Sequence, residues 1–71
     1  MAQRSSIVVC EVLEVLPPPL ALAHVRAADG LVYGLNPKTP GITFYALQPG
    51  QWVKCEVTEK FHRVLHAELV S

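Results

Sequence analysis

The feature that most constrains the fold is a period-two alternation of apolar and polar side chains that runs twice through the last third of the chain. The alternating apolar positions are Val53, Cys55 and Val57 in the first run, and Leu65, Ala67 and Leu69 in the second. Successive side chains of a strand point to opposite faces of a sheet, so this spacing predicts two half-buried strands, over residues 51–58 and 63–70. The short connection at residues 59–62 joins them into a hairpin, with the alternating apolar side chains inside and Trp52 outside.

The N-terminal part of the chain predicts one long strand. Residues 7–16 are rich in β-branched side chains, which favour strands. The proline run at residues 17–19 ends this strand, because proline cannot donate a ladder hydrogen bond. A strand of this length can bend across two halves of a small barrel.

The pair Asp29-Gly30 lies between two apolar runs and predicts a second hairpin with a two-residue turn. In that register Arg26 faces Tyr33, and Val25 faces Gly34. We expect the face of small side chains to be inside and the polar and aromatic face to be outside. The inner set is Ala23, Val25, Ala27, Val32 and Gly34, and the outer set is His24, Arg26, Tyr33 and Leu35.

Residues 36–50 are rich in proline and glycine and predict a loop. Within it, residues 43–47 favour a single helical turn that closes one end of the barrel. The whole pattern predicts an all-β fold of five strands, with a short helical turn between the third and fourth strands.

Length and composition exclude several classes of protein. A chain of 71 residues predicts a single domain spanning residues 1–71, with its core within about residues 7–70. The chain has 51% hydrophobic residues and zero net charge, from six basic and six acidic side chains. It therefore lacks the composition of a disordered segment and that of a strongly basic nucleic-acid-binding domain.

The chain also lacks the parts of a catalytic site. Ser5, Ser6 and Ser71 lie near its ends, and Asp29, the single aspartate, lies in a turn. No nucleophile beside a base and no pair of catalytic carboxylates can be assembled from these positions. We therefore expect a binding protein and no enzyme.

Metal and cofactor sites are not expected either. On a strand, the spacing of His62 and His66 separates their Cα atoms by about 13 Å, too far for one zinc ion to bridge them easily. Cys10 and Cys55 fit no metal-ligand spacing and predict reduced thiols in small core sites.

The N-terminal sequence argues against export and membrane insertion. Glu11 and Glu14 interrupt the apolar stretch that would form a secretory signal. No segment reaches the roughly 20 apolar residues of a membrane span. We expect a cytoplasmic protein.

Several short motifs resemble bacterial translation initiation factor one. Residues 12–18, V-L-E-V-L-P-P, resemble the V-L-E-T-L-P of that family, and Asp29-Gly30 resembles its Asn-Gly turn. Residues 49–53, P-G-Q-W-V, resemble its P-G-D-x-V, and residues 57–64, V-T-E-K-F-H-R-V, lie where its last hairpin lies. The RNA-binding repeats of the largest small-subunit ribosomal protein share this layout.

The resemblance covers about residues 7–70 and implies an OB-fold, a five-stranded, partly open Greek-key barrel. It also implies RNA binding. His24 stands where the family has an arginine in its second strand. Lys38 is the single cation of residues 35–41, which correspond to the basic stretch H-I-S-G-K-M-R of the family.

In OB-folds the ligand lies on the second and third strands and on the neighbouring loops. We therefore predict weak binding of RNA or single-stranded DNA, because aromatic side chains stack on bases while cations follow the phosphates. The predicted site comprises His24, Arg26, Tyr33, Lys38, Lys60, Phe61 and Arg63.

The alternative is a barrel that binds the ribosome or another protein, or that forms a homodimer, without binding nucleic acid. Its basis is the number of large apolar side chains, which exceeds what a small barrel can enclose. The side chains in excess are among Leu13, Leu20, Leu22, Leu31, Leu35 and Trp52.

Overall fold

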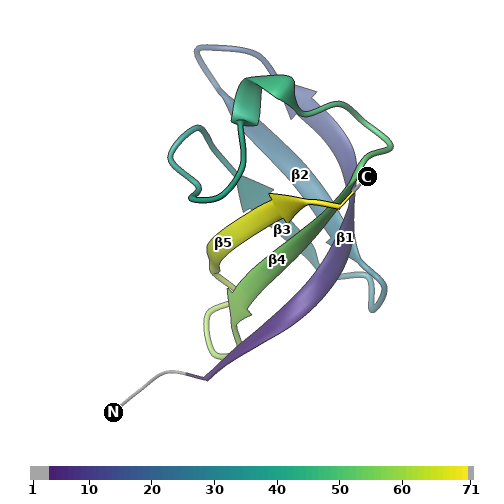
Figure 1. Cartoon of the computed structure of the whole chain (residues 1–71), viewed down its shortest axis with the longest axis vertical. Coiled ribbons are helices and arrows are strands. Elements are labelled where there is room, and N and C mark those ends of the chain that lie inside the picture. The colour runs from purple at the N-terminus through teal and green to yellow at the C-terminus, as the bar shows by residue number, and fades with distance from the viewer. Residues whose placement is uncertain (1–3, 71) are drawn as a thin grey trace.

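Five antiparallel strands form one sheet that curls into a half-barrel (Figure 1). The computed structural model describes residues 4–70. The elements are β1 (Ser5–Leu16), β2 (Leu22–Ala27), β3 (Val32–Leu35), the 3₁₀ turn η1 (Phe44–Ala46), β4 (Trp52–Thr58) and β5 (Val64–Leu69). The sheet order is β3-β2-β1-β4-β5. The all-β class, both predicted hairpins and the helical turn between the third and fourth strands are confirmed.

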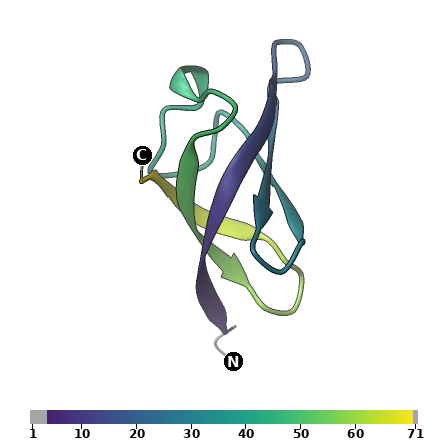
Figure 2. The ribbon, with the colours of Figure 1, turned by 90° about the vertical axis from the view of Figure 1, so that its right-hand side faces the viewer.

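The long strand β1 lies at the centre of the sheet and holds its two halves together (Figure 2). Residues 5–11 pair with β4, whereas residues 10–16 pair with β2. The register with β2 shifts between Val12 and Glu14, where a bulge adds one residue to β1. Because a bulge bends and twists its strand, it lets β1 cross from one half of the curled sheet to the other.

The core lies on the concave side of the sheet. Val25, Val53 and Leu35 are among its largest fully buried side chains, and Phe44 and Leu47 close one end from the 3₁₀ turn and the residue that follows it. Full burial of an aliphatic side chain stabilises the fold by roughly 1.5–3 kcal/mol. The alternation in β4 is confirmed, since Val53, Cys55 and Val57 point inward.

Cys10 and Cys55 are free and fully buried in this core, as predicted. Removal from water disfavours the charged thiolate, so burial raises the pKa of Cys55 to about 12. Burial also raises the pKa of Cys10. Both side chains are therefore neutral thiols at physiological pH and act as small apolar core residues.

The predicted register of the β2–β3 hairpin is wrong by one residue. Val25 pairs with Tyr33, and His24 pairs with Gly34. The turn has three residues instead of two: the Gly30 N–H donates to the Ala27 carbonyl, and the Ala27 N–H donates to the Leu31 carbonyl. Gly30 has a φ of 90°, as expected for the left-handed residue that ends such a turn.

This one-residue difference reverses the faces of β3 and leaves those of β2 as predicted. Tyr33 and Leu35 are buried, although both were predicted outside. Val32 and Gly34 are exposed, although both were predicted inside. The prediction that Tyr33 projects into solvent beside Arg26 is therefore wrong.

A second correction concerns β5. Leu65 and Leu69 were predicted in the core, but they are 43% and 51% exposed. The register with β4 shifts between Glu56 and Val57, so that Val57 pairs with Val64 and Leu65 is the extra residue. As a result Val64 packs against the core and Leu65 faces outward.

Within residues 4–70, no helix is long and apolar enough to cross a membrane.

Candidate functional site

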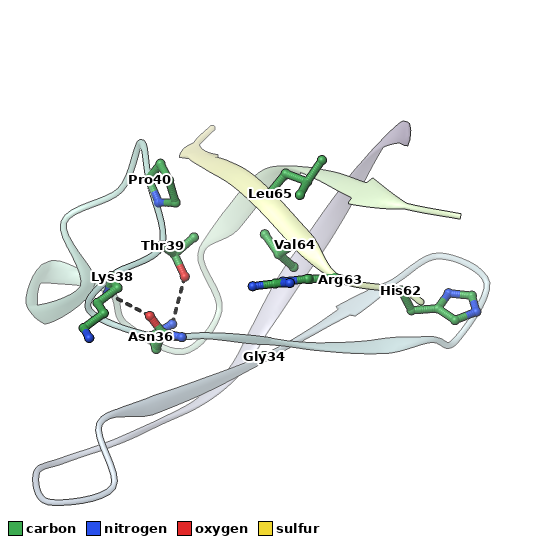
Figure 3. A pocket seen from close by; sticks show the side chains of 9 residues that line it. All are labelled: Gly34, Asn36, Lys38, Thr39, Pro40, His62, Arg63, Val64 and Leu65. Carbon is green, nitrogen blue, oxygen red and sulfur yellow. Dashed lines mark hydrogen bonds between the residues drawn. The ribbon is translucent and has the colours of Figure 1, made fainter. Parts of the chain in front are cut away.

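A seam runs between β3 and β5, the two end strands of the curled sheet. These strands approach each other, but no ladder of hydrogen bonds joins them in the described part of the chain. The seam holds an open cavity of about 520 Å³ (Figure 3). Its lining residues are Gly34, Asn36, Lys38, Thr39, Pro40, His62, Arg63, Val64 and Leu65. We call this set the seam cavity.

One wall of the seam cavity is the loop that follows β3, and local hydrogen bonds fix its shape. The side-chain oxygen Oδ1 of Asn36 accepts a hydrogen bond from the Lys38 N–H at 2.7 Å. The Thr39 Oγ1 accepts one from the Asn36 N–H at 3.0 Å, and the Asn36 carbonyl accepts one from the Thr39 N–H. Asparagine side chains favour such turns because they can bond to the backbone two residues further on.

The same loop is anchored to β5 at the far side of the cavity. The Ala67 N–H donates to the Pro40 carbonyl at 3.0 Å. Gly41 follows with a φ of 93°, and a Cβ atom at this position would clash with the Ala67 carbonyl and the His66 ring. Only glycine allows this close approach, which holds Lys38 and Thr39 beside the seam.

The opposite wall is the β4–β5 turn, which positions Arg63. The Thr58 N–H donates to the Arg63 carbonyl at 2.8 Å, and the Thr58 Oγ1 accepts from the Arg63 N–H at 3.1 Å. Thr58 is itself buried, so this end of the turn is fixed to the core. Figure 3 shows the Arg63 side chain reaching across toward the loop that carries Asn36 and Thr39, while Lys38 lies at the outer rim of that loop.

The charged side chains that line the seam cavity are all basic. Its lining includes Lys38, Arg63 and His62 but no aspartate or glutamate. Glu68, which follows the lining residues of β5, is in register with Lys54, and Glu59, which precedes those of the β4–β5 turn, accepts a hydrogen bond from the Ser6 hydroxyl on β1 at 2.9 Å. Its carboxylate is therefore directed toward β1. A site lined by cations without carboxylates attracts anions, and loop amides and hydroxyls can add hydrogen bonds to a bound oxyanion.

Two further predicted residues lie in the β4–β5 turn, immediately before the seam cavity. Lys60 places its ammonium nitrogen 5.4 Å from the centre of the Phe61 ring. Phe61 is 63% exposed, so part of its ring remains open to solvent. An exposed aromatic ring beside cations can stack with a planar ligand.

His24 and Arg26 lie elsewhere, on the outer face of β2. The Nδ1 atom of His24 lies 2.7 Å from the Glu14 Oε1. Arg26 pairs in register with Glu11 on β1. These two predicted residues are therefore not brought together with the seam cavity, since neither of them lines it.

Tyr33 is excluded from any exposed binding face by its burial. Only 5% of its surface is exposed, and burial raises the pKa of its phenol. Its ring centre lies 6.3 Å from that of His62, so it supports the β4–β5 turn from inside the barrel. A buried ring of this kind cannot stack with a base.

The structure thus brings Lys38 and Arg63 together in the lining of the seam cavity. Lys60 and Phe61 lie in the same turn as Arg63, just before it in the sequence. Sequence reasoning missed Asn36 and Thr39 as lining residues. The sequence N-P-K-T-P-G carried a signal for a tight turn, but nothing in it showed that the turn would face β5.

Among residues 4–70, no three histidine, cysteine or acidic side chains come together in a group that could hold a metal ion. Comparison with protein-family models, with curated proteins and with solved structures finds no match to this chain.

Proposed function

We propose that the half-barrel is an OB-fold and that the protein binds RNA or single-stranded DNA at the seam cavity. Two observations support the fold assignment. In the sheet order, β4 returns beside β1 after the three strands β1, β2 and β3, which is the Greek-key arrangement. The motifs that resemble translation initiation factor one are also spread along the chain, from residue 12 to residue 64.

The observation that carries the functional proposal is the charge distribution at the seam. The chain as a whole has zero net charge, yet the seam cavity contains two of its six cations and none of its six carboxylates. Phosphate groups are the commonest anions that such a lining accommodates in a nucleic-acid-binding protein. Binding would be weak, since few phosphates can be contacted at once.

The residues take distinct roles in this proposal. Arg63 contacts phosphate through its planar guanidinium, which can form two parallel hydrogen bonds. Lys38 contributes charge from the opposite rim, and Phe61 offers its exposed face to a base. Unstacked bases of a single strand can reach the ring, whereas the stacked bases of a duplex cannot.

The proposed site is smaller than the sequence-based one. It retains Lys38, Lys60, Phe61 and Arg63. His24 and Arg26 are left out because they lie on the outer face of β2 and do not line the seam cavity, and Tyr33 is left out because it is buried.

A titration with a mixed-sequence RNA oligomer, followed by amide chemical shifts, tests the proposal. Shifts are expected in residues 36–41 and 59–65 at low salt. If about two phosphates are contacted, the logarithm of the affinity should fall against the logarithm of the salt concentration with a slope near −1.4. Absence of any shift at ~1 mM oligomer and low salt would exclude binding of biological strength, since even non-specific affinities are typically 10⁻⁴–10⁻⁶ M.

A pair of double variants locates the site. Lys38→Ala with Arg63→Ala removes both seam cations, and we expect at least tenfold weaker binding and a flatter salt dependence. Arg26→Ala with Lys54→Ala removes the same charge from the outer face and serves as the control. Equal weakening by the two double variants would show attraction to net charge only and would contradict a site at the seam.

A further inference from the structure

The N-terminal half of β1 has one free edge. Residues 5–9 pair with β4, whereas pairing with β2 begins only at Cys10 (Figure 1). The Arg4 carbonyl accepts a hydrogen bond from the Glu59 N–H, and both backbone groups of Val12 bond to the segment before β4. Because peptide groups alternate in direction along a strand, those of Ser5, Ile7 and Val9 face the free edge. Within residues 4–70, no strand lies on this side of β1 to accept or donate hydrogen bonds to these peptide groups.

This edge lacks the features that usually protect a free edge. Charged side chains, prolines and short length normally prevent strand addition, but residues 5–9 read S-S-I-V-V. Ile7 and Val9 are 59% and 47% exposed. The two end strands of the sheet, in contrast, are protected. Strand β3 has only four residues, and the Pro40–Ala67 hydrogen bond holds a loop against β5.

We propose that a second copy of this chain pairs with this edge, with the two β1 strands antiparallel and Ile7 on the twofold axis. Ile7 then faces Ile7 of the second copy, and Ser5 faces Val9. All three residues turn their peptide groups to the free edge, so each pair exchanges two hydrogen bonds. The same strand serves on both sides, as an isologous twofold interface requires.

Charge complementarity at the ends of this ladder favours a second copy over another partner. In this register, Arg4 of the second copy would come next, opposite Cys10. That position is already taken by Ala27 of β2, so the second copy must leave the ladder at its Arg4, beside the β2–β3 turn. There a cavity of about 330 Å³ is lined by Val8, Val9, Ala27, Ala28 and Asp29. Arg4 of the second copy would therefore approach Asp29, and the twofold axis would repeat this pair at the other end.

The interface is separate from the seam cavity, which lies between β3 and β5. Dimer formation and nucleic-acid binding can therefore succeed or fail independently.

The mass in solution tests the proposal. Sedimentation equilibrium of the full chain over a wide concentration range should show conversion from 7.8 kDa to twice that mass. Ile7→Lys places like charges opposite each other on the axis and should leave a folded monomer. Val32→Lys, at an equally exposed apolar site on β3, is the matched control and should still dimerise. A wild-type chain that stays monomeric at all concentrations would overturn the proposal, as would a dimer that survives Ile7→Lys.

A cysteine cross-link tests the register and does not depend on introducing a charge. Directly opposed residues of a hydrogen-bonded pair have Cα atoms about 5.5 Å apart, within the range that a disulfide spans. Mild oxidation of Ile7→Cys should therefore give a covalent dimer, while Cys10 and Cys55 stay buried and unreactive. Val32→Cys should form no covalent dimer, because position 32 lies away from the proposed interface. Equal cross-linking of the two variants would indicate random collision and would exclude the proposed interface.

Discussion

The outer face of the sheet and the seam cavity carry the same kinds of charged residue in opposite arrangements. On the outer face, Arg26 pairs in register with Glu11, and Lys54 pairs with Glu68. In the seam cavity, Lys38 and Arg63 have no carboxylate among the residues that line it with them. Net charge therefore says little about where this protein can hold an anion.

The cause of this difference is the way each surface is built. Side chains on adjacent strands face each other at fixed separations, so opposite charges in register offset one another. Exposed pairs of this kind add only about 0–1 kcal/mol of stability, but they reduce the local electrostatic potential. The cations of the seam lie on a loop and a turn, where no strand register supplies a partner. Its cations remain available to an external anion.

The largest effect is expected from reversing a charge in the seam. Arg63→Glu removes a charged hydrogen-bond donor worth about 1.5–3 kcal/mol, so affinity for an RNA oligomer should fall about 10- to 100-fold. Arg63→Lys keeps the charge and should lose much less. The measurement is fluorescence anisotropy at low salt, with amide spectra to verify the fold.

Arg26→Glu is the matched reversal on the outer face. We expect a change of about twofold at most, because screening limits the influence of a distant exposed charge. If Arg26→Glu weakened binding as much as Arg63→Glu, the contrast between the two surfaces would have no functional meaning.

Local sequence patterns predicted several strands correctly but did not predict which side chains of β3 lie on the outer face of the sheet. The alternation in β4 and the end of β1 at Leu16 are local patterns, and both are confirmed, although β1 begins at Ser5 and not at the predicted residue 7. The faces of β3 depended on whether the turn at Asp29 has two residues or three, and Asp-Gly is compatible with both. One residue of turn length moved Tyr33 from the predicted outer face into the core.

The seam could not be predicted, because it depends on contacts between distant segments. Lys38 reaches it through a loop whose approach to β5 requires glycine at position 41. Arg63 reaches it through the hydrogen bonds of Thr58. No periodicity along the chain records that these two segments meet, so only the individual residues Lys38 and Arg63 could be nominated in advance.

A second experiment introduces a carboxylate into the seam cavity, whose lining has none. Leu65 lines the seam cavity and is exposed, so Leu65→Glu adds a carboxylate near Arg63 without removing a buried contact. An interaction of ~1 kcal/mol, the strength of two opposite charges about 4 Å apart in water, corresponds to about fivefold weaker binding of RNA. Leu65→Gln has the same shape without the charge and should bind nearly as the wild type does. Identical behaviour of the two variants would argue against an electrostatic site.

A third experiment separates stacking from charge. Phe61→Ala removes the exposed ring beside the seam and should weaken binding of a single-stranded oligomer about fivefold, the lower end of the range for base stacking. Its salt dependence should be unchanged, because no phosphate contact is lost. Tyr45→Ala removes an equally exposed ring from the 3₁₀ turn and is the control. A loss of affinity for Tyr45→Ala alone would move the stacking surface to the other end of the barrel.

The smallest effect is expected from removing a carboxylate that is in register with a cation on the outer face. Glu68→Gln removes the carboxylate in register with Lys54 and raises the net charge of the chain by one unit. Only the local potential near Lys54 changes, so RNA affinity should rise by about twofold or less, an amount that added salt should abolish. Amide shifts on titration should still be confined to residues 36–41 and 59–65. Strong new shifts along β4 and β5 would mean that a cation without a carboxylate in register is sufficient to bind RNA. The geometry of the loop and the turn at the seam would then be unnecessary for binding.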